Sequence, residues 1–492
     1  MAKEPRPARR PVAGDRHPQP VRVAEVHCQS YPCLRTLAGS NIPMSLTRRV
    51  LFAATCVAVV LSAAASADPP RRPHVLVIVA DDLGYADVGF HGCQDISTPH
   101  IDALSASGVV CTQGYVSGPY CSPTRAGLLT GRYQQRFGHE FNPSGPGGGL
   151  PLDQVTLADR LARAGYETAL VGKWHLGERR EFHPLARGFD TFFGFLGGDH
   201  PYRPEAAGGQ QILRDRQPIA ETEYLTDAFA REAVRFLDRE HERPFFLYLA
   251  FNAVHTPLQA DDARLARCAA IVDPRRRTYA AMLTAMDDAI GQVRAVLEDR
   301  GLDRDTLCFF FSDNGGPTMP GTAINGSSNA PLRGSKRQTL EGGIRVPFVV
   351  SWPGTLPPGR YERPVIQLDI APTVLAAAGI TTTDSRFDGI NILPHLAGRD
   401  ASEPHETLSW RFGEQMAIRR GDWKLVCWGP TEKLDVTETW PKLFDLAADP
   451  GESRDLSAHE PARVADLAAA WRAWDATLLR PVAASDSQTR EE

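Results

Sequence analysis

The sequence predicts an α/β protein with a large, mainly parallel β-sheet covered by helices, followed by a smaller α+β domain. Four continuous apolar runs have the length of strands and lack the period-2 alternation of half-exposed strands. Helical patterns lie between these runs, and such alternation is typical of parallel sheets that are covered on both faces. The expected strands are residues 75–80, 168–171, 245–251 and 307–311, and the expected helices are residues 156–164, 226–240 and 277–300.

The N-terminal part has the pattern of an export signal. Residues 44–67 begin with two arginines, continue with an apolar run over residues 50–61 and end with a small-residue cleavage site at Ala65 to Ala67. We therefore expect an exported protein, either periplasmic or secreted. The run is shorter than the about 20 apolar residues that span a bilayer, so no stable membrane insertion is expected. Residues 1–43 are then an untranslated stretch before a start at Met44, or a disordered extension before an internal signal anchor.

Charge and cysteine content exclude two classes of site. The formal net charge is −5, and residues 1–67 hold nine Lys/Arg against three Asp/Glu, so the remainder stands at −11. Such an acidic body lacks the basic footprint that nucleic acid binding needs, and no nucleic acid partner is expected. None of the nine cysteines has the spacing of a zinc site, and the sequence does not fix which of them pair in disulfides.

Polar side chains follow the carboxyl ends of all four expected strands. In open α/β sheets, ligands bind beyond the carboxyl ends of the strands, so these side chains are expected to meet at one edge. Taken singly, each has an ordinary structural interpretation as a helix cap, a turn residue or a solvated charge. Four of them offer only oxygen donors, which suit a hard cation, and their carboxylate content favours Ca²⁺ over Mg²⁺. The polar residues are Asp81 and Asp82, Lys173 and His175, His255, and Asp313 and Asn314; the oxygen donors are Asp81, Asp82, Asp313 and Asn314.

One segment identifies a family. Residues 121–132 read CSPTRAGLLTGR and resemble, without a departure, the C-x-P-x-R-x-x-x-L-T-G-R signature of type I (formylglycine-dependent) sulfatases. The resemblance runs from about residue 73 to about residue 460. Further blocks that look like family blocks, in family order, are VADDLGYADVGFHG, GYETALVGKWHLG, FFLYLAFNAVHTP, FFFSDNGG and GSKRQTLEGGIRVPF.

The resemblance implies an alkaline-phosphatase-like fold. A catalytic domain is expected over residues 72–395 and a small α+β domain over residues 396–478, followed by a polar tail over residues 479–492. Within the small domain, the expected strands are residues 407–411, 415–419 and 423–427, and the expected helix is residues 461–475.

The resemblance also implies the active-site chemistry. In the family, a formylglycine-generating enzyme oxidises the signature cysteine to Cα-formylglycine, whose hydrated aldehyde is the nucleophile, which assigns that role to Cys121. Arg125 and Lys173 are implied to steady the formylglycine and the sulfate oxygens, and His175 to act on the formylglycine hydroxyl. His255 and Lys336 are implied to face the ester oxygen that leaves. The implied Ca²⁺ ligands are Asp81, Asp82, Asp313, Asn314 and the modified Cys121.

Physical chemistry supports these assignments. A sulfate monoester is negatively charged and repels a nucleophile, so a divalent cation and fixed cations are needed as the transition state forms. The expected reaction is therefore sulfate ester hydrolysis. Similarity to glycan-type members favours sulfated carbohydrates over small aryl sulfates as substrates.

Two alternatives remain open at this point. The first is phosphonate or phosphate ester hydrolysis by the same fold and the same oxidised cysteine. The second is a non-catalytic protein that binds sulfated glycans. Such a protein is expected to have lost at least one active-site group, and Cys121, His175, His255 and Lys336 are all present.

The export signal yields a first testable prediction. Expression that begins at Met44 is expected to give an exported protein whose N-terminus is Asp68, because the cleavage site ends at Ala67. N-terminal sequencing of the exported protein measures this directly. Recovery of residues 1–43 on the natural protein would contradict the prediction.

Overall fold

The computed structural model describes residues 72–143, 148–206, 208–381, 386–428 and 441–481. The expected signal peptide, the stretch before it and residues 482–492 of the expected tail lie outside the described residues. The expected domain limits at residues 395 and 478 stay a prediction.

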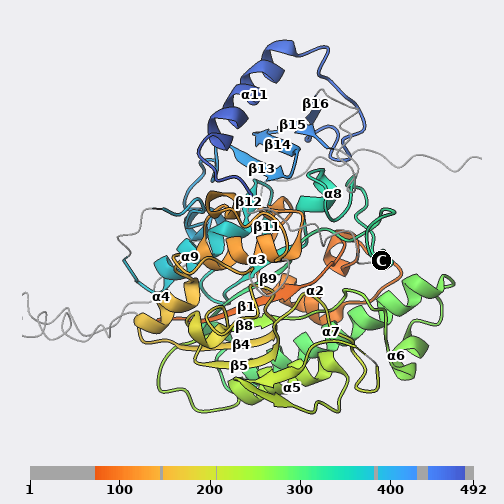
Figure 1. Ribbon diagram of the computed structural model, residues 1–492, viewed down its shortest axis with the longest axis vertical. Coiled ribbons are helices and arrows are strands. Elements are labelled where there is room, and N and C mark those ends of the chain that lie inside the picture. Colours follow the sequence, from red (N-terminus) through yellow and green to blue (C-terminus); the bar gives the residue numbers. More distant parts are fainter. Residues whose placement is uncertain (1–71, 144–147, 207, 382–385, 429–440, 482–492) are drawn as a thin grey trace, which may run out of the picture. The chain divides into compact units, whose positions relative to one another are not determined.

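A ten-stranded β-sheet runs through the structure, and its five central strands are parallel to one another (Figure 1). The prediction of a large, mainly parallel sheet is thus confirmed. The sheet becomes antiparallel on both sides of this centre, where β10 pairs with β9 and β2, and β6 pairs with β5 and β7. In sheet order, the strands are β11 (Gly359–Tyr361), β2 (Val109–Cys111), β10 (Phe348–Ser351), β9 (Thr306–Ser312), β1 (His74–Ala80), β8 (Phe245–Ala250), β4 (Glu167–Lys173), β5 (Thr191–Phe195), β6 (Ile212–Arg214) and β7 (Gln217–Ile219).

Helices cover both faces of this sheet, which explains the continuous apolar runs. Alternate residues of β1 point to opposite faces: Leu76 and Ile78 pack in one apolar core, and Val75 and Val77 in the other. The first core is completed by α2 (Pro99–Ala106), α5 (Leu225–Leu237) and α7 (Pro274–Asp299), and the second by α3 (Cys121–Thr130), α4 (Leu157–Arg163), α9 (Ile370–Ala377) and α10 (Leu393–Leu396).

Shorter elements connect these layers. The strands β3 (Gly114–Tyr115) and β12 (Val365–Ile366) form a separate parallel pair. Single helical turns or short helices are α6 (Asp262–Arg267), α8 (Glu341–Ile344), η1 (Gly89–His91), η2 (Gln134–Phe137), η3 (Pro184–Ala186), η4 (Asp303–Asp305) and η5 (Gln367–Asp369).

A second sheet, of four antiparallel strands, lies in the C-terminal part of the chain. Its strands are β13 (Leu408–Phe412), β14 (Gln415–Arg420), β15 (Trp423–Cys427) and β16 (Lys442–Asp445), in that order. Ile418 and Leu425 on one face pack against α11 (Pro461–Asp475) through Leu467. Trp410 and Ala417 on the other face pack against residues of the large-sheet part, such as Tyr115. The small sheet is therefore a layer between α11 and the rest of the structure.

Two smaller observations complete the fold. Among the residues that the structure describes, no helix is both long and apolar enough to cross a bilayer. The described cysteines are Cys93, Cys111, Cys121, Cys268, Cys308 and Cys427, and all are free thiols.

Candidate active site

The signature segment forms helix α3, which begins at Cys121 and is buried along its whole length. Pro123 lies in the first turn, where the missing backbone N–H interrupts no bond within the helix. Gly131 ends the helix with φ 66°, the left-handed conformation typical of this position. Cys121 and Arg125 are four residues apart, so they lie on the same face of the helix. The spacing in the motif therefore places a thiol and a guanidinium side by side.

The pairing of β1 with β9 brings the acidic residues together. Ala80 pairs with Ser312 at the carboxyl ends of the two strands, so Asp81 and Asp82 lie beside Asp313 and Asn314. The Asp82 backbone N–H donates to Asp313 Oδ1 at 3.3 Å, and Asn314 Nδ2 donates to Asp82 Oδ1 at 2.6 Å. All four side chains are fully buried. The expectation that these strand ends meet at one edge of the sheet agrees with this geometry.

Buried cations balance these carboxylates. Lys173, at the end of β4, lies 2.5 Å from Asp81 Oδ2, and Arg125 donates to Asp313 Oδ2 through Nη2 at 2.7 Å and Nε at 3.0 Å. Burial alone would raise the pKa of Asp81, but Lys173, His255 and Arg125 together hold it below its usual value. Asp81 is therefore a carboxylate at neutral pH, although water does not reach it.

Four side chains gather into a group that suits a metal ion. Asp81, Asp82, Cys121 and His255 each place one ligand atom within 4.8 Å of the others. Asn314 Oδ1 is buried and accepts no hydrogen bond. Buried acceptors are nearly always satisfied, so this orphaned oxygen indicates a partner such as a cation.

The donor set fits the predicted ion. Carboxylate and amide oxygens are ligands of hard cations such as Ca²⁺. Asp313, another predicted ligand, lies outside the group of four, and Arg125 binds its Oδ2 while Oδ1 accepts from Asp82. His255, which the resemblance assigned to the leaving oxygen, lies inside the group.

Lys336 and His255 both lie next to Asp82. Lys336 Nζ is 2.9 Å from the Asp82 carboxylate, and His255 Nε2 is 3.6 Å from Asp82 Oδ2. Burial would lower the pKa of Lys336, but the nearby anionic groups, Asp82 foremost, raise it well above its usual value, so Lys336 is an ammonium ion. The His255 side chain is 15% exposed, whereas Asp82 is fully buried. His255 thus lies between the buried charges and solvent, where a substrate would arrive.

His175 has a different environment. Its backbone takes φ 58°, and a Cβ on Gly198 would come within 2.7 Å of its Nε2, so the glycine at position 198 leaves room for the imidazole ring. Burial, and then the positive charges of Lys173 and Arg125, lower the pKa of His175 well below its usual value. The imidazole is therefore neutral at neutral pH and can accept a proton.

Sequence analysis missed two residues that support this site. Ser122 Oγ donates to the His175 carbonyl at 2.6 Å, and Asn325 Nδ2 donates to the backbone carbonyls of Asp82 and Val254. Ser122 lies inside the signature segment at a position that the signature leaves open, so the motif gave no signal for it. Asn325 lies in an irregular loop without any motif, and only the structure reveals its contact with Asp82.

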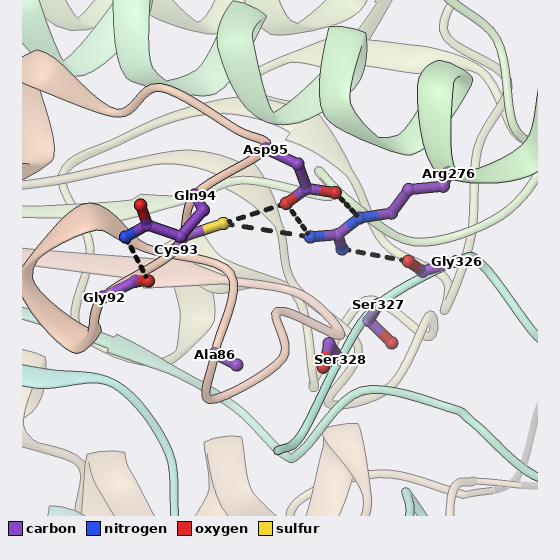
Figure 2. Close-up of a pocket in the computed structure, with 9 residues that line it drawn as sticks. All are labelled: Ala86, Gly92, Cys93, Gln94, Asp95, Arg276, Gly326, Ser327 and Ser328. Atoms are coloured by element: carbon purple, nitrogen blue, oxygen red, sulfur yellow. Dashed lines mark hydrogen bonds and ion pairs between the residues drawn. The ribbon is translucent and has the colours of Figure 1, made fainter. Parts of the chain in front are cut away.

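A separate hollow of about 430 Å³ lies at the surface. Its walls include Cys93, Asp95 and Arg276, and Figure 2 shows the Arg276 guanidinium bound to Asp95 and to the carbonyl of Gly326. None of the predicted active-site residues lines this hollow. The candidate active site is therefore separate from this hollow.

Known proteins resemble the chain in sequence and in structure. The family model described as Sulfatase matches residues 73–380, and the model described as N-sulphoglucosamine sulphohydrolase, C-terminal, matches residues 334–469. N-acetylgalactosamine-6-sulfatase of Canis lupus familiaris is 32% identical over 450 residues, which cover 81% of this chain and 84% of the relative. Arylsulfatase A of Bos taurus is 33% identical over 452 residues, which cover 80% of this chain and 85% of the relative.

A solved structure agrees with these relatives. The crystal structure of Ps i-CgsB in complex with k-i-k-neocarrahexaose superposes with a TM-score of 0.78 at 35% identity, covering 85% of this chain and 96% of that one. The architecture is the alkaline-phosphatase-like fold of sulfatases, as the sequence predicted. Since one family model matches more than half of the chain and relatives of this family are about one-third identical over four-fifths of it, the chain belongs to the sulfatase family and is a sulfuric ester hydrolase.

Proposed function

We propose that this sulfatase hydrolyses sulfate monoesters of glycans with Cys121, oxidised to formylglycine, as nucleophile and with one Ca²⁺ ion. The observation that carries the proposal is the surroundings of Cys121. Its Sγ lies 3.6 Å from Asp81 Oδ1, inside a buried group that also holds Lys173, Arg125 and Lys336. Fixed cations at a nucleophile are what the chemistry of an anionic ester requires.

Sulfated saccharides are the proposed substrates. One relative is named N-acetylgalactosamine-6-sulfatase, and one similar structure contains k-i-k-neocarrahexaose. Both names concern carbohydrates, which supports a sugar sulfate as the substrate of this chain.

The unmodified thiol is a poor nucleophile here. Cys121 is 1% exposed, and burial raises the pKa of its thiol above the usual value, although Lys173 and Lys336 act in the opposite direction. The reactive thiolate is therefore scarce at neutral pH. Oxidation by a formylglycine-generating enzyme would replace the thiol with an aldehyde, whose hydrate offers hydroxyl groups as nucleophiles.

The metal ion would be held by the acidic strand ends. We assign Asp81, Asp82, Asp313 and Asn314 as its ligands, together with the modified Cys121; the orphaned Asn314 Oδ1 supports this assignment. A bound Ca²⁺ ion would supply positive charge next to the sulfate oxygens.

The remaining side chains of the site have two kinds of role: some transfer protons, and others stabilise negative charge. Arg125 and Lys173 fix the carboxylates and add positive charge beside position 121. His175 is neutral, so its ring can accept the proton of the hydroxyl at position 121, although the lowered pKa makes it a weak base. Lys336 is charged, and with the partly exposed His255 it is placed to stabilise or protonate the leaving oxygen.

We also propose that the protein is exported. The signal pattern of residues 44–67 supports a periplasmic or secreted location, in which the mature chain would meet glycans from outside the cell.

The first test concerns position 121. In a host with formylglycine-generating activity, mass spectrometry of the peptide that contains Cys121 is expected to show an aldehyde in place of the thiol. Cys121→Ala is expected to lower kcat by about 1,000-fold or more, because the nucleophile is lost. Cys268→Ala, a matched change at another buried thiol, is expected to retain activity. Substantial sulfatase activity in Cys121→Ala would refute the assignment.

The second test concerns the metal. Removal of Ca²⁺ by a chelator is expected to abolish activity and lower Tm, and Ca²⁺ is expected to restore both better than Mg²⁺, because an ion that binds only the folded state stabilises it. Asn314→Ala removes the orphaned oxygen and is expected to weaken Ca²⁺ binding about tenfold or more, as measured by calorimetry. Asn391→Ala, outside the site, serves as control. Full activity in a metal-free preparation would exclude the proposal.

The third test separates the roles of the basic residues. If His255 and Lys336 assist the leaving oxygen, His255→Ala and Lys336→Ala are expected to lower kcat/KM on a sugar sulfate by roughly 100-fold. The loss on 4-nitrophenyl sulfate is expected to be about tenfold or less, because nitrophenolate leaves with little help. His175→Ala is expected to impair both substrates. Equal losses on both substrates for the His255 and Lys336 variants would mean that these residues only bind the sulfate.

A further inference from the structure

The segment that carries Lys336 is held by the C-terminal sheet. Gln415 of β14 contacts this segment twice: its Nε2 donates to the Arg337 carbonyl at 2.9 Å, and its Oε1 accepts from the Thr339 N–H at 3.1 Å. On the other side, the Lys336 N–H donates to the Gly316 carbonyl at 3.2 Å. The segment has no regular structure before α8 begins at Glu341. Its position therefore depends on such contacts.

Glu452 forms hydrogen bonds with residues on both sides of Lys336 in this segment. It lies in the loop between β16 and α11, is fully buried and has φ 52°, which is unusual for a residue other than glycine. Its backbone carbonyl accepts from Arg333 Nη1 at 2.9 Å, and its Oε2 accepts from the Glu341 N–H at 2.7 Å. Arg333 precedes Lys336 by three residues, and Glu341 follows it by five. One residue thus bridges the whole segment.

A buried lysine fixes the Glu452 side chain. Lys424 Nζ of β15 lies 2.9 Å from Glu452 Oε1 and 2.9 Å from Glu341 Oε1, and none of these side chains is exposed. Tyr115 donates to the second Glu341 oxygen at 2.6 Å. Lys424 of the small sheet thus holds Glu452 and Glu341, at the end of the Lys336 segment, in one buried group, so the positions of the three side chains depend on one another. The ion-pair group therefore couples the small sheet to the segment of Lys336.

We propose that Glu452 is a positioning residue that holds Lys336 in place for departure of the leaving oxygen, through its bonds to Arg333, Glu341 and Lys424. This inference rests on the role proposed above for Lys336. The need for such a device follows from the side chain itself, because a lysine has four rotatable bonds and loses much rotational freedom when it is held. Lys336 Nζ is nevertheless held 2.9 Å from Asp82, which requires a fixed backbone.

A double-mutant cycle tests the connection. Glu452→Ala is expected to lower kcat on a sugar sulfate about tenfold or more, with a KM change below about threefold and a much smaller loss on 4-nitrophenyl sulfate. In a Lys336→Ala background, the same change is expected to cost less than about twofold, because the group it positions is gone. Losses that multiply in the double variant, or that are equal on both substrates, would overturn the proposal.

Glu140→Ala is the matched control. Glu140 is also a buried carboxylate that joins the small sheet to the rest of the structure, through Arg411 of β13 at 2.7 Å. The Glu140 carboxylate accepts hydrogen bonds from the Arg411 side chain and from the Gly413 N–H, outside the segment of Lys336. This variant is expected to lower Tm without the substrate-dependent loss. If Glu452→Ala does not fold, Glu452→Gln replaces it, because the amide retains an acceptor for the Glu341 N–H but loses the ion pair.

A second readout does not depend on turnover. The Lys336 side chain is only 7% exposed, so acetic anhydride is expected to acetylate it slowly. Mass spectrometry is expected to show acetylation of Lys336, relative to Lys442, at least threefold faster in Glu452→Ala and unchanged in Glu140→Ala. Unchanged labelling in Glu452→Ala would overturn the positioning role. A wild-type protein that carries formylglycine yet hydrolyses no sulfate ester would refute the proposed function alone, since labelling still reports on Lys336.

Discussion

The structure depends on charges that are buried together at one edge of the large sheet. Asp81 and Asp313 leave adjacent strands with their side chains out of water, and Lys173 and Arg125 meet them there. Neither the two carboxylates nor the two cations would be stable at this buried position without the other pair, since a buried unpaired ion costs several kcal/mol or more. The four charges meet only because three features of the fold place them there. These are the parallel pairing of β1 with β9, the residue at which β4 ends and the residue at which α3 begins. Loss of any one of these charges would leave a buried partner unpaired, so the geometry of the site and the fold around it depend on each other.

The sequence predicts the central strands of the large sheet well, but it does not predict the strands at the edge of that sheet. The strands β1, β4, β8 and β9 are buried on both faces, so a continuous apolar run marks each of them, although the run in β4 (ETALVGK) covers only the middle of the strand. The margins give no such signal: β6 (ILR) and β7 (QPI) are three residues long and partly exposed. Such strands form because a neighbour offers unpaired backbone groups, which a single sequence does not reveal.

The same distinction holds in the active site. Asp81, Lys173 and Asp313 could be predicted because residues that follow parallel strands meet at one edge. Lys336 lies in a long irregular connection after β9, and only the resemblance to a family pointed to it. Asn325, Gln415 and Glu452 carry no local signal at all, because each acts through a contact with a distant part of the chain. Residues that do chemistry leave a motif, whereas residues that hold them depend on tertiary packing.

Burial of Cys121 has a consequence for the order of events in the life of the protein. The residue is 1% exposed and begins a helix that is buried from end to end. An enzyme that oxidises its side chain must reach it while this stretch is still unfolded. Under the proposed function, oxidation and folding would therefore compete for each newly made chain, and a chain that folds first would keep its thiol. The active fraction of a preparation would then depend on the relative rates of oxidation and folding during synthesis, so a well-folded sample could be largely inert.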